Sequence, residues 1–153
     1  MAEFTHFKKD GSAVMVDVHE KPDTYRAASA TGTIQVSPEV FAAVRDHTAK
    51  KGDVLGVARL AGIMGAKKNA ELIPLCHIVP LTNCEVTFTT DENTNSITAV
   101  CTTSCVGKTG VEMEALTGVS TALLTIYDMC KAMDRGMVCL LYTSPSPRDV
   151  EES

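Results

Sequence analysis

Two charged residues near the C-terminal end of the chain have the spacing of an acid–base pair. Asp128 and Lys131 are three positions apart, so on a helix they lie on one face and can interact. A surface ion pair is one interpretation. Their neighbours in LLTIYDMCKAM are mostly apolar, however, which predicts a partly buried pair. Because burial shifts the pKa values of both groups, the pair is a candidate for proton transfer.

Two further carboxylates and a histidine are candidates for the same chemistry. Glu112 and Glu114 open the long helix that ends with the pair, and the alternative is that they only complement the helix dipole. His77 lies in the segment ELIPLCHIVP, whose two prolines favour an extended loop. A single histidine in such a loop is either a structural residue or a functional one, and the spacing leaves both interpretations open.

The basic residues gather in one stretch. Residues 50–75 carry five Lys or Arg against two Asp or Glu, whereas the whole chain has a net charge of −5. A locally positive stretch on an acidic protein suits a small, multiply anionic ligand. The alternative is a solvated helix end, where cations complement the dipole.

The glycine-rich segment VGKTG at residues 106–110 has the position of a phosphate loop between a strand and a helix. The Walker pattern requires a glycine five positions before Gly107, and Thr102 stands there. The segment is therefore interpreted as a tight turn at a helix entry, and a nucleoside triphosphatase is disfavoured.

The spacing of Glu114 and Asp128 predicts a site between subunits. The two residues are 14 positions apart, so they return to the same helix face but lie about 21 Å apart along its axis. They cannot form one compact carboxylate pair within a chain. If both serve one small substrate, two antiparallel copies of this helix would bring Glu114 of one chain near Asp128 of the other.

Composition restricts the class of protein. The 153 residues predict one domain, and 44% apolar with 22% charged residues exclude a mainly disordered chain. The acidic balance and the 5% aromatic content disfavour a nucleic-acid binder, including an RNA-recognition domain. No membrane span or secretory signal is recognisable, so we expect a cytoplasmic protein. The six cysteines lack zinc-ligand spacing and are expected to be small core residues.

Hydrophobic periodicity and capping residues predict seven elements. Strands are expected at residues 25–36, 81–90, 97–105 and 137–142, with the middle two forming a hairpin around DENTNS. Helices are expected from Ser37-Pro38 to about Lys51, from Asp53 to about Asn69, and over residues 111–133. The second helix is apolar on most sides, which predicts burial between elements or subunits. The order β-α-α-β-β-α-β is typical of a ferredoxin-like α+β fold, an antiparallel sheet with helices packed on one face.

Several long segments resemble the cyclic pyranopterin monophosphate synthases, the family of molybdenum cofactor biosynthesis protein C. They are MVDV, TYRAASATG, KKGDVLGVARLAGIMGAKKNAELIPLCHIVPL and VGKTGVEMEALTGVSTALLTIYDMCKAMDRGM, which span about residues 15–137. The resemblance implies a ferredoxin-like lyase that converts 3′,8-cyclo-7,8-dihydroguanosine 5′-triphosphate into cyclic pyranopterin monophosphate and diphosphate. It implies no metal, no redox cofactor and no nucleic-acid partner.

The resemblance also implies roles for individual residues. Asp128 is the expected acid–base residue, and Lys131 is its partner. The segments Leu75-Cys76-His77 and Met113-Glu114 match substrate-contacting segments of the family. The other implied substrate-binding residues are Lys51, Lys67, Arg26 and Glu112.

The family is a homohexamer, a trimer of dimers with its pocket at the dimer interface, which agrees with the helix-spacing argument. The C-terminal end departs from the family, because VCLLYTSPSPRDVEES stands where a Gly-Gly-Lys-Ser-Gly-like segment is expected and it holds no lysine. We therefore predict one synthase domain over residues 1–143, with a flexible N-terminus at 1–14, and a disordered or non-family tail at 144–153. The alternatives are a non-catalytic ferredoxin-like binding module and a family member impaired by its tail.

Overall fold

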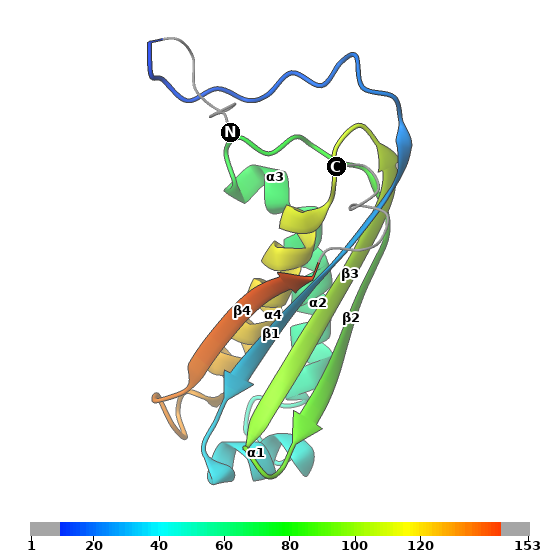
Figure 1. The fold of residues 1–153 in the computed structure, drawn as a ribbon. Helices are drawn as coiled ribbons and strands as arrows, with labels where there is room; N and C mark the ends of the chain where they lie inside the picture. Colours follow the sequence, from blue (N-terminus) through cyan, green and yellow to red (C-terminus); the bar gives the residue numbers. More distant parts are fainter. Residues whose placement is uncertain (1–9, 145–153) are drawn as a thin grey trace.

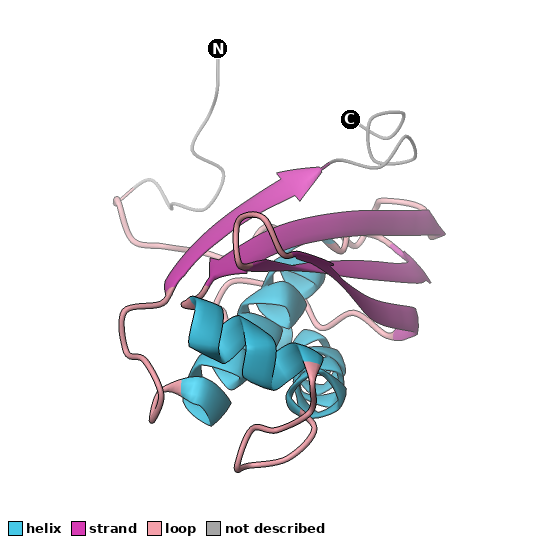
Figure 2. Cartoon of the chain, turned by 90° about the horizontal axis from the view of Figure 1, so that it is seen from below, coloured by secondary structure: helices cyan, strands magenta, loops and turns pink. Residues whose placement is uncertain are grey.

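The structure, a computed structural model, describes residues 10–144 of the chain. One antiparallel sheet has the strand order β2-β3-β1-β4, and helices cover one of its faces (Figures 1 and 2). The elements in chain order are β1 (Thr24–Gln35), α1 (Pro38–Arg45), α2 (Val54–Lys67), α3 (Asn69–Leu72), β2 (Leu81–Asp91), β3 (Ser96–Gly107), α4 (Glu112–Cys130) and β4 (Val138–Ser144). This is the predicted ferredoxin-like α+β architecture.

The sheet is built on a long central pair of strands. β1 and β3 pair along their whole length, from Thr24 opposite Gly107 to Gln35 opposite Ser96. Side chains of β1 alternate between buried and half-buried, as expected for a strand with one face against a core. The predicted β2–β3 hairpin is confirmed. Its turn includes Asn95, which has a positive φ of 51°.

Side-chain caps begin the first two helices where the sequence predicts them. Ser37 Oγ accepts a hydrogen bond from the Val40 amide at 3.2 Å, with Pro38 in the first turn. Asp53 Oδ1 accepts from the Gly56 amide at 3.1 Å. Each cap satisfies a backbone N–H that the helix itself leaves without an acceptor.

The end of the first helix was predicted wrongly. It stops at Arg45 rather than near Lys51, because His47 adopts a left-handed φ of 58° and the Thr48 amide donates to the Ala43 carbonyl at 2.9 Å. This is a Schellman ending without the usual glycine. The second helix ends at Lys67, and α3, which the sequence analysis did not predict, follows at Asn69.

Small residues bring the two long helices close together. α2 packs against α4, and α4 also covers β1 and β3. A Cβ atom on Gly62 would lie 3.0 Å from the Gly118 carbonyl oxygen, so the two backbones approach each other at this point. The core beneath them is rich in alanine, valine and isoleucine.

The cysteines only partly follow the prediction of small core residues. Cys101, Cys105 and Cys130 are buried, but Cys76 and Cys84 are half-buried and Cys139 is exposed. The exceptions lie at the periphery, in the loop before β2 and on the edge strands β2 and β4.

β4 begins one residue later than predicted and ends at Ser144. The rest of the predicted tail, and most of the N-terminus predicted to be flexible, lie outside the described residues. None of the helices within residues 10–144 has the length and apolar character needed to cross a membrane.

Candidate active site

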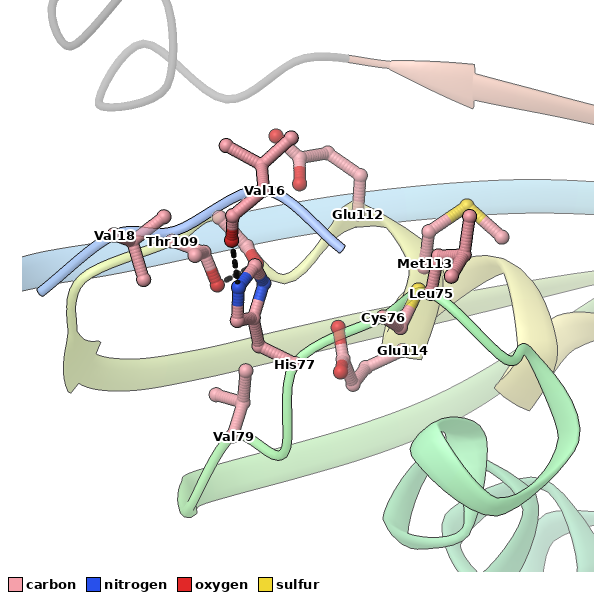
Figure 3. A pocket seen from close by; sticks show the side chains of 11 residues that line it. Val16, Val18, Leu75, Cys76, His77, Val79, Thr109, Glu112, Met113 and Glu114 are labelled. Atoms are coloured by element: carbon pink, nitrogen blue, oxygen red, sulfur yellow. Dashed lines mark hydrogen bonds between the residues drawn. The ribbon is translucent and has the colours of Figure 1, made fainter. Parts of the chain in front are cut away.

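Two segments that the sequence analysis singled out line one cavity of about 320 Å³. Leu75, Cys76 and His77 come from the loop before β2, and Glu112, Met113 and Glu114 come from the first turn of α4 (Figure 3). The remaining walls are Val16 and Val18 of the N-terminal segment, Val79, and Thr109 and Gly110 of the loop before α4. Six predicted substrate-binding residues thus meet at one end of the sheet.

Glu114 is the buried carboxyl group of this cavity. Its exposure is 5%, whereas Glu112, two residues earlier, is exposed. Burial raises the pKa of Glu114, and a hydrogen bond of 3.2 Å from Nδ2 of Asn69 opposes that effect. The burial of Glu114 beside the cavity goes beyond what complementing the helix dipole requires.

His77 connects the cavity to the N-terminal segment. Its Nε2 hydrogen-bonds to the Val16 carbonyl oxygen (Figure 3). Since a carbonyl oxygen only accepts, Nε2 carries the proton in this contact. The sequence analysis missed Val16 and Val18 as wall residues, because a wall supplied by an irregular segment leaves no periodic signal.

Arg26 contacts the loop that forms one wall of the cavity. The residue is 4% exposed on β1, and its guanidinium donates to the carbonyl oxygens of Gly107 and Lys108 at 3.3 Å each. It therefore holds the loop that carries Thr109 and Gly110. Lys67, by contrast, lies exposed at the end of α2 and is not among the residues that line the cavity.

A second polar cluster lies at the opposite end of α4. Lys131 Nζ donates to Asp128 Oδ1 at 2.9 Å, and Lys51 Nζ lies 3.6 Å from Asp128 Oδ2. The predicted pair therefore forms and gains a second lysine from the loop before α2. The hydrogen bond and charge of Lys131, followed by the charge of Lys51, lower the pKa of Asp128.

The predicted partial burial of the Asp128–Lys131 pair is wrong for the single chain. The Asp128 side chain is 58% exposed, because it lies on the face of α4 that points away from the sheet. Leu124, one turn earlier on that face, is 65% exposed. The apolar neighbours that suggested burial mostly cover the core instead of the pair.

The two clusters are separated within one chain. α4 is a continuous helix from Glu112 to Cys130, so Glu114 and Asp128 lie about 21 Å apart along its axis. Figure 1 shows α4 running from the end of the sheet near α3 to the end near α1. No group of three or more His, Cys, Asp or Glu with the arrangement of a metal site occurs within residues 10–144.

Fold and site together define an α+β domain with a cavity at one end of its sheet that is lined by titratable side chains. The chain belongs to the MoaC family, whose model matches residues 15–141. It is 56% identical over 135 residues to a cyclic pyranopterin monophosphate synthase of Clostridium botulinum (strain Alaska E43 / Type E3). That alignment covers 88% of this chain and 85% of the relative.

Replacing Glu114 with Gln is expected to raise the free energy of unfolding at pH 7. Because the folded state raises the pKa of Glu114, folding favours its protonated form. This contribution to stability is present below the unfolded pKa near 4.5 and is lost as pH rises through the folded pKa. Gln stays neutral, so the gain should disappear in acid. Urea unfolding over a pH series measures it.

Glu85→Gln is the matched control, since Glu85 is an exposed residue of β2. It should leave the pH dependence of unfolding unchanged. If the free energy of unfolding depended on pH identically in the wild type and in Glu114→Gln, the burial of the ionised Glu114 carboxylate would not destabilise the fold.

Proposed function

We propose that the protein catalyses the formation of cyclic pyranopterin monophosphate in molybdenum cofactor biosynthesis. The observation that carries the proposal is the 56% identity to a synthase of that name along most of both chains. The cavity supports it, because the two family-like segments around His77 and Glu114 meet there. The substrate is the cyclised guanosine triphosphate named above, and the products are cyclic pyranopterin monophosphate and diphosphate.

In the proposed mechanism, cationic side chains hold the triphosphate while Asp128 and Lys131 exchange protons with the substrate. The guanine-derived ring opens and recloses to the pyranopterin. A ribose-derived hydroxyl oxygen then forms a bond to the inner phosphorus, the bond from that phosphorus to the bridging oxygen breaks, and diphosphate leaves. Positioning and charge stabilisation supply most of the rate enhancement.

The direct test is to incubate the protein with the cyclised nucleotide and to measure released diphosphate. Stoichiometric release together with cyclic pyranopterin monophosphate is expected. Binding without release would favour a non-catalytic module or a family member impaired by its C-terminal tail.

The proposal includes an active site shared between two copies of the chain. Asp128 and Lys131 lie at the far end of α4 from the cavity, so a second copy running antiparallel would bring the two halves together. Exposed apolar residues on α2 and α4 supply a surface for such contact, among them Leu60 at 61% and Leu124 at 65% exposure. By family resemblance the assembly is a hexamer built as a trimer of dimers, in the cytoplasm.

Replacing Lys67 with Ala is expected to raise KM about tenfold, equal to about 1.4 kcal/mol, with little change in kcat. Lys67 ends α2 as an exposed side chain and is proposed to bind phosphate. Because salt screens exposed charges, the ratio of mutant to wild-type KM should shrink at high ionic strength. Initial-rate measurements at low and high salt test this.

Lys68→Ala is the matched control, because Lys68 is the adjacent exposed lysine. Lys68→Ala should raise KM less than Lys67→Ala does. A fall in kcat as large as the rise in KM in Lys67→Ala would contradict a role limited to binding.

A further inference from the structure

A chain of two hydrogen bonds links Thr117, in the second turn of α4, through Asn69 to the carboxyl group of the cavity. Thr117 Oγ1 donates to Asn69 Oδ1 at 2.6 Å, and Asn69 Nδ2 donates to Glu114 Oε2 at 3.2 Å. Asn69 is 1% exposed and Glu114 is 5% exposed. Buried polar groups of this kind stabilise a structure only when their hydrogen bonds are satisfied, so each partner constrains the others.

The partners determine which way the Asn69 amide faces. The ionised Glu114 carboxylate only accepts hydrogen bonds, so the amide nitrogen must face it. The hydroxyl of Thr117 then donates to the amide oxygen. Rotating the amide by half a turn would place its oxygen against the carboxylate, where two acceptors repel each other.

The backbone of Asn69 is held by a hydrogen bond of the short helix α3. The residue begins α3 directly after α2, and its carbonyl oxygen accepts a hydrogen bond from the Ile73 amide at 2.9 Å. It is not among the residues that line the cavity. Of the two side-chain hydrogen bonds of Asn69 among the described residues, the one to Glu114 reaches a residue that lines the cavity.

We infer that Asn69 is a positioning residue of the active site, whose amide, oriented by Thr117, holds the Glu114 carboxylate in place at the cavity. The inference rests on the proposed function for the reaction that it serves. Asn69 was not among the site residues that the sequence analysis predicted, although it lies in one of the family-like segments. Its role follows from the place where the short α3 meets α4.

The chemical consequence concerns the ionisation of Glu114. Burial favours its protonated form, and the nearby charge of Glu112 acts in the same direction. Two hydrogen bonds favour the ionised form and lower the pKa, first the one from the backbone amide of Glu114 itself and then the one from Asn69. The other titratable groups that line this cavity are Cys76 and His77, and Arg26 lies behind its loop. Without Asn69, Glu114 would remain protonated to a higher pH.

The test is the titration of the Glu114 carboxyl group, followed by carbon-13 NMR in the ligand-free protein. Asn69→Leu removes the donor with a side chain of similar size, and Thr117→Val removes the orienting hydroxyl. Asn69→Leu is expected to raise the pKa of Glu114 by about one pH unit. Thr117→Val should move it in the same direction by less. In the pH profile of kcat/KM for diphosphate release, the acid limb should shift to higher pH together with the pKa of Glu114.

Thr125→Val is the matched control. It makes the same substitution on the same helix, where the Thr125 hydroxyl donates only to the Thr121 carbonyl at 2.8 Å among the contacts of the described residues. It should leave the titration of Glu114 unchanged.

An unchanged Glu114 titration in folded Asn69→Leu would overturn the inference. If that variant does not fold, an unchanged titration in Thr117→Val overturns it instead. The failure of the proposed function has a different signature, because a wild-type protein that releases no diphosphate can still be titrated at Glu114.

Discussion

Replacing Asp128 with Asn is expected to lower kcat by about 10²-fold or more, with only a modest change in KM. Asn keeps the shape of the side chain and can still accept a hydrogen bond from Lys131, which now lies 2.9 Å from the carboxylate. It cannot take up or return a proton at neutral pH. The two lysines keep the wild-type group ionised, since they lower its pKa. Steady-state assays of diphosphate release measure the loss.

Asp91→Asn is the matched control for this experiment. Asp91 ends β2 as an exposed residue, and its carboxylate accepts from the Asn93 amide at 2.9 Å, a bond that Asn can also accept. Its kcat should equal that of the wild type. A folded Asp128→Asn variant that retained most of its kcat would remove Asp128 from the proposed proton transfer.

Mixing inactive Glu114→Ala chains with inactive Asp128→Ala chains is expected to restore activity. If each site takes Glu114 from one chain and Asp128 from its partner, a mixed dimer holds one intact site and one site that lacks both groups. Random exchange at equal concentrations makes about half of the dimers mixed, so activity should approach about one quarter of the wild-type value for a two-fold symmetric pair. The rate of diphosphate release, measured after subunit exchange, tests this expectation.

Mixing Asp128→Ala with Lys131→Ala chains is the control. Both substitutions damage the same half of the site, because Lys131 hydrogen-bonds to Asp128 within one chain. No intact site can form, so activity should stay at the level of the parents. If mass spectrometry shows mixed oligomers of the first pair without restored activity, each chain forms its own site.

Local interactions explain why much of the fold could be predicted from the sequence. Ser37 and Asp53 cap helices through hydrogen bonds to amides three residues later, so short stretches of sequence contain the whole signal. The alternation of buried and half-buried residues along β1 is equally local. The end of α1 was missed because His47, not glycine, adopts the left-handed conformation there.

The sequence predicted part of the candidate site, the segments around His77 and Glu114, but not how the site is arranged. Helix geometry and the positions of Glu114 and Asp128 alone determined that these residues lie about 21 Å apart, since both belong to one continuous helix. The exposure of Asp128 could not be predicted in the same way. Exposure depends on which face of α4 the sheet covers, and that is a property of packing between distant segments.

Composition, helix caps and strand periodicity thus determined by themselves the ferredoxin-like class and the order of all elements except the short α3. The tertiary structure alone decided which polar groups that are distant in the sequence meet. Asn69 reaches Glu114 across 45 positions of sequence, and His77 reaches Val16 across 61. Such contacts leave no periodic or short-range pattern, because they arise only when the packing of apolar faces has brought the segments together.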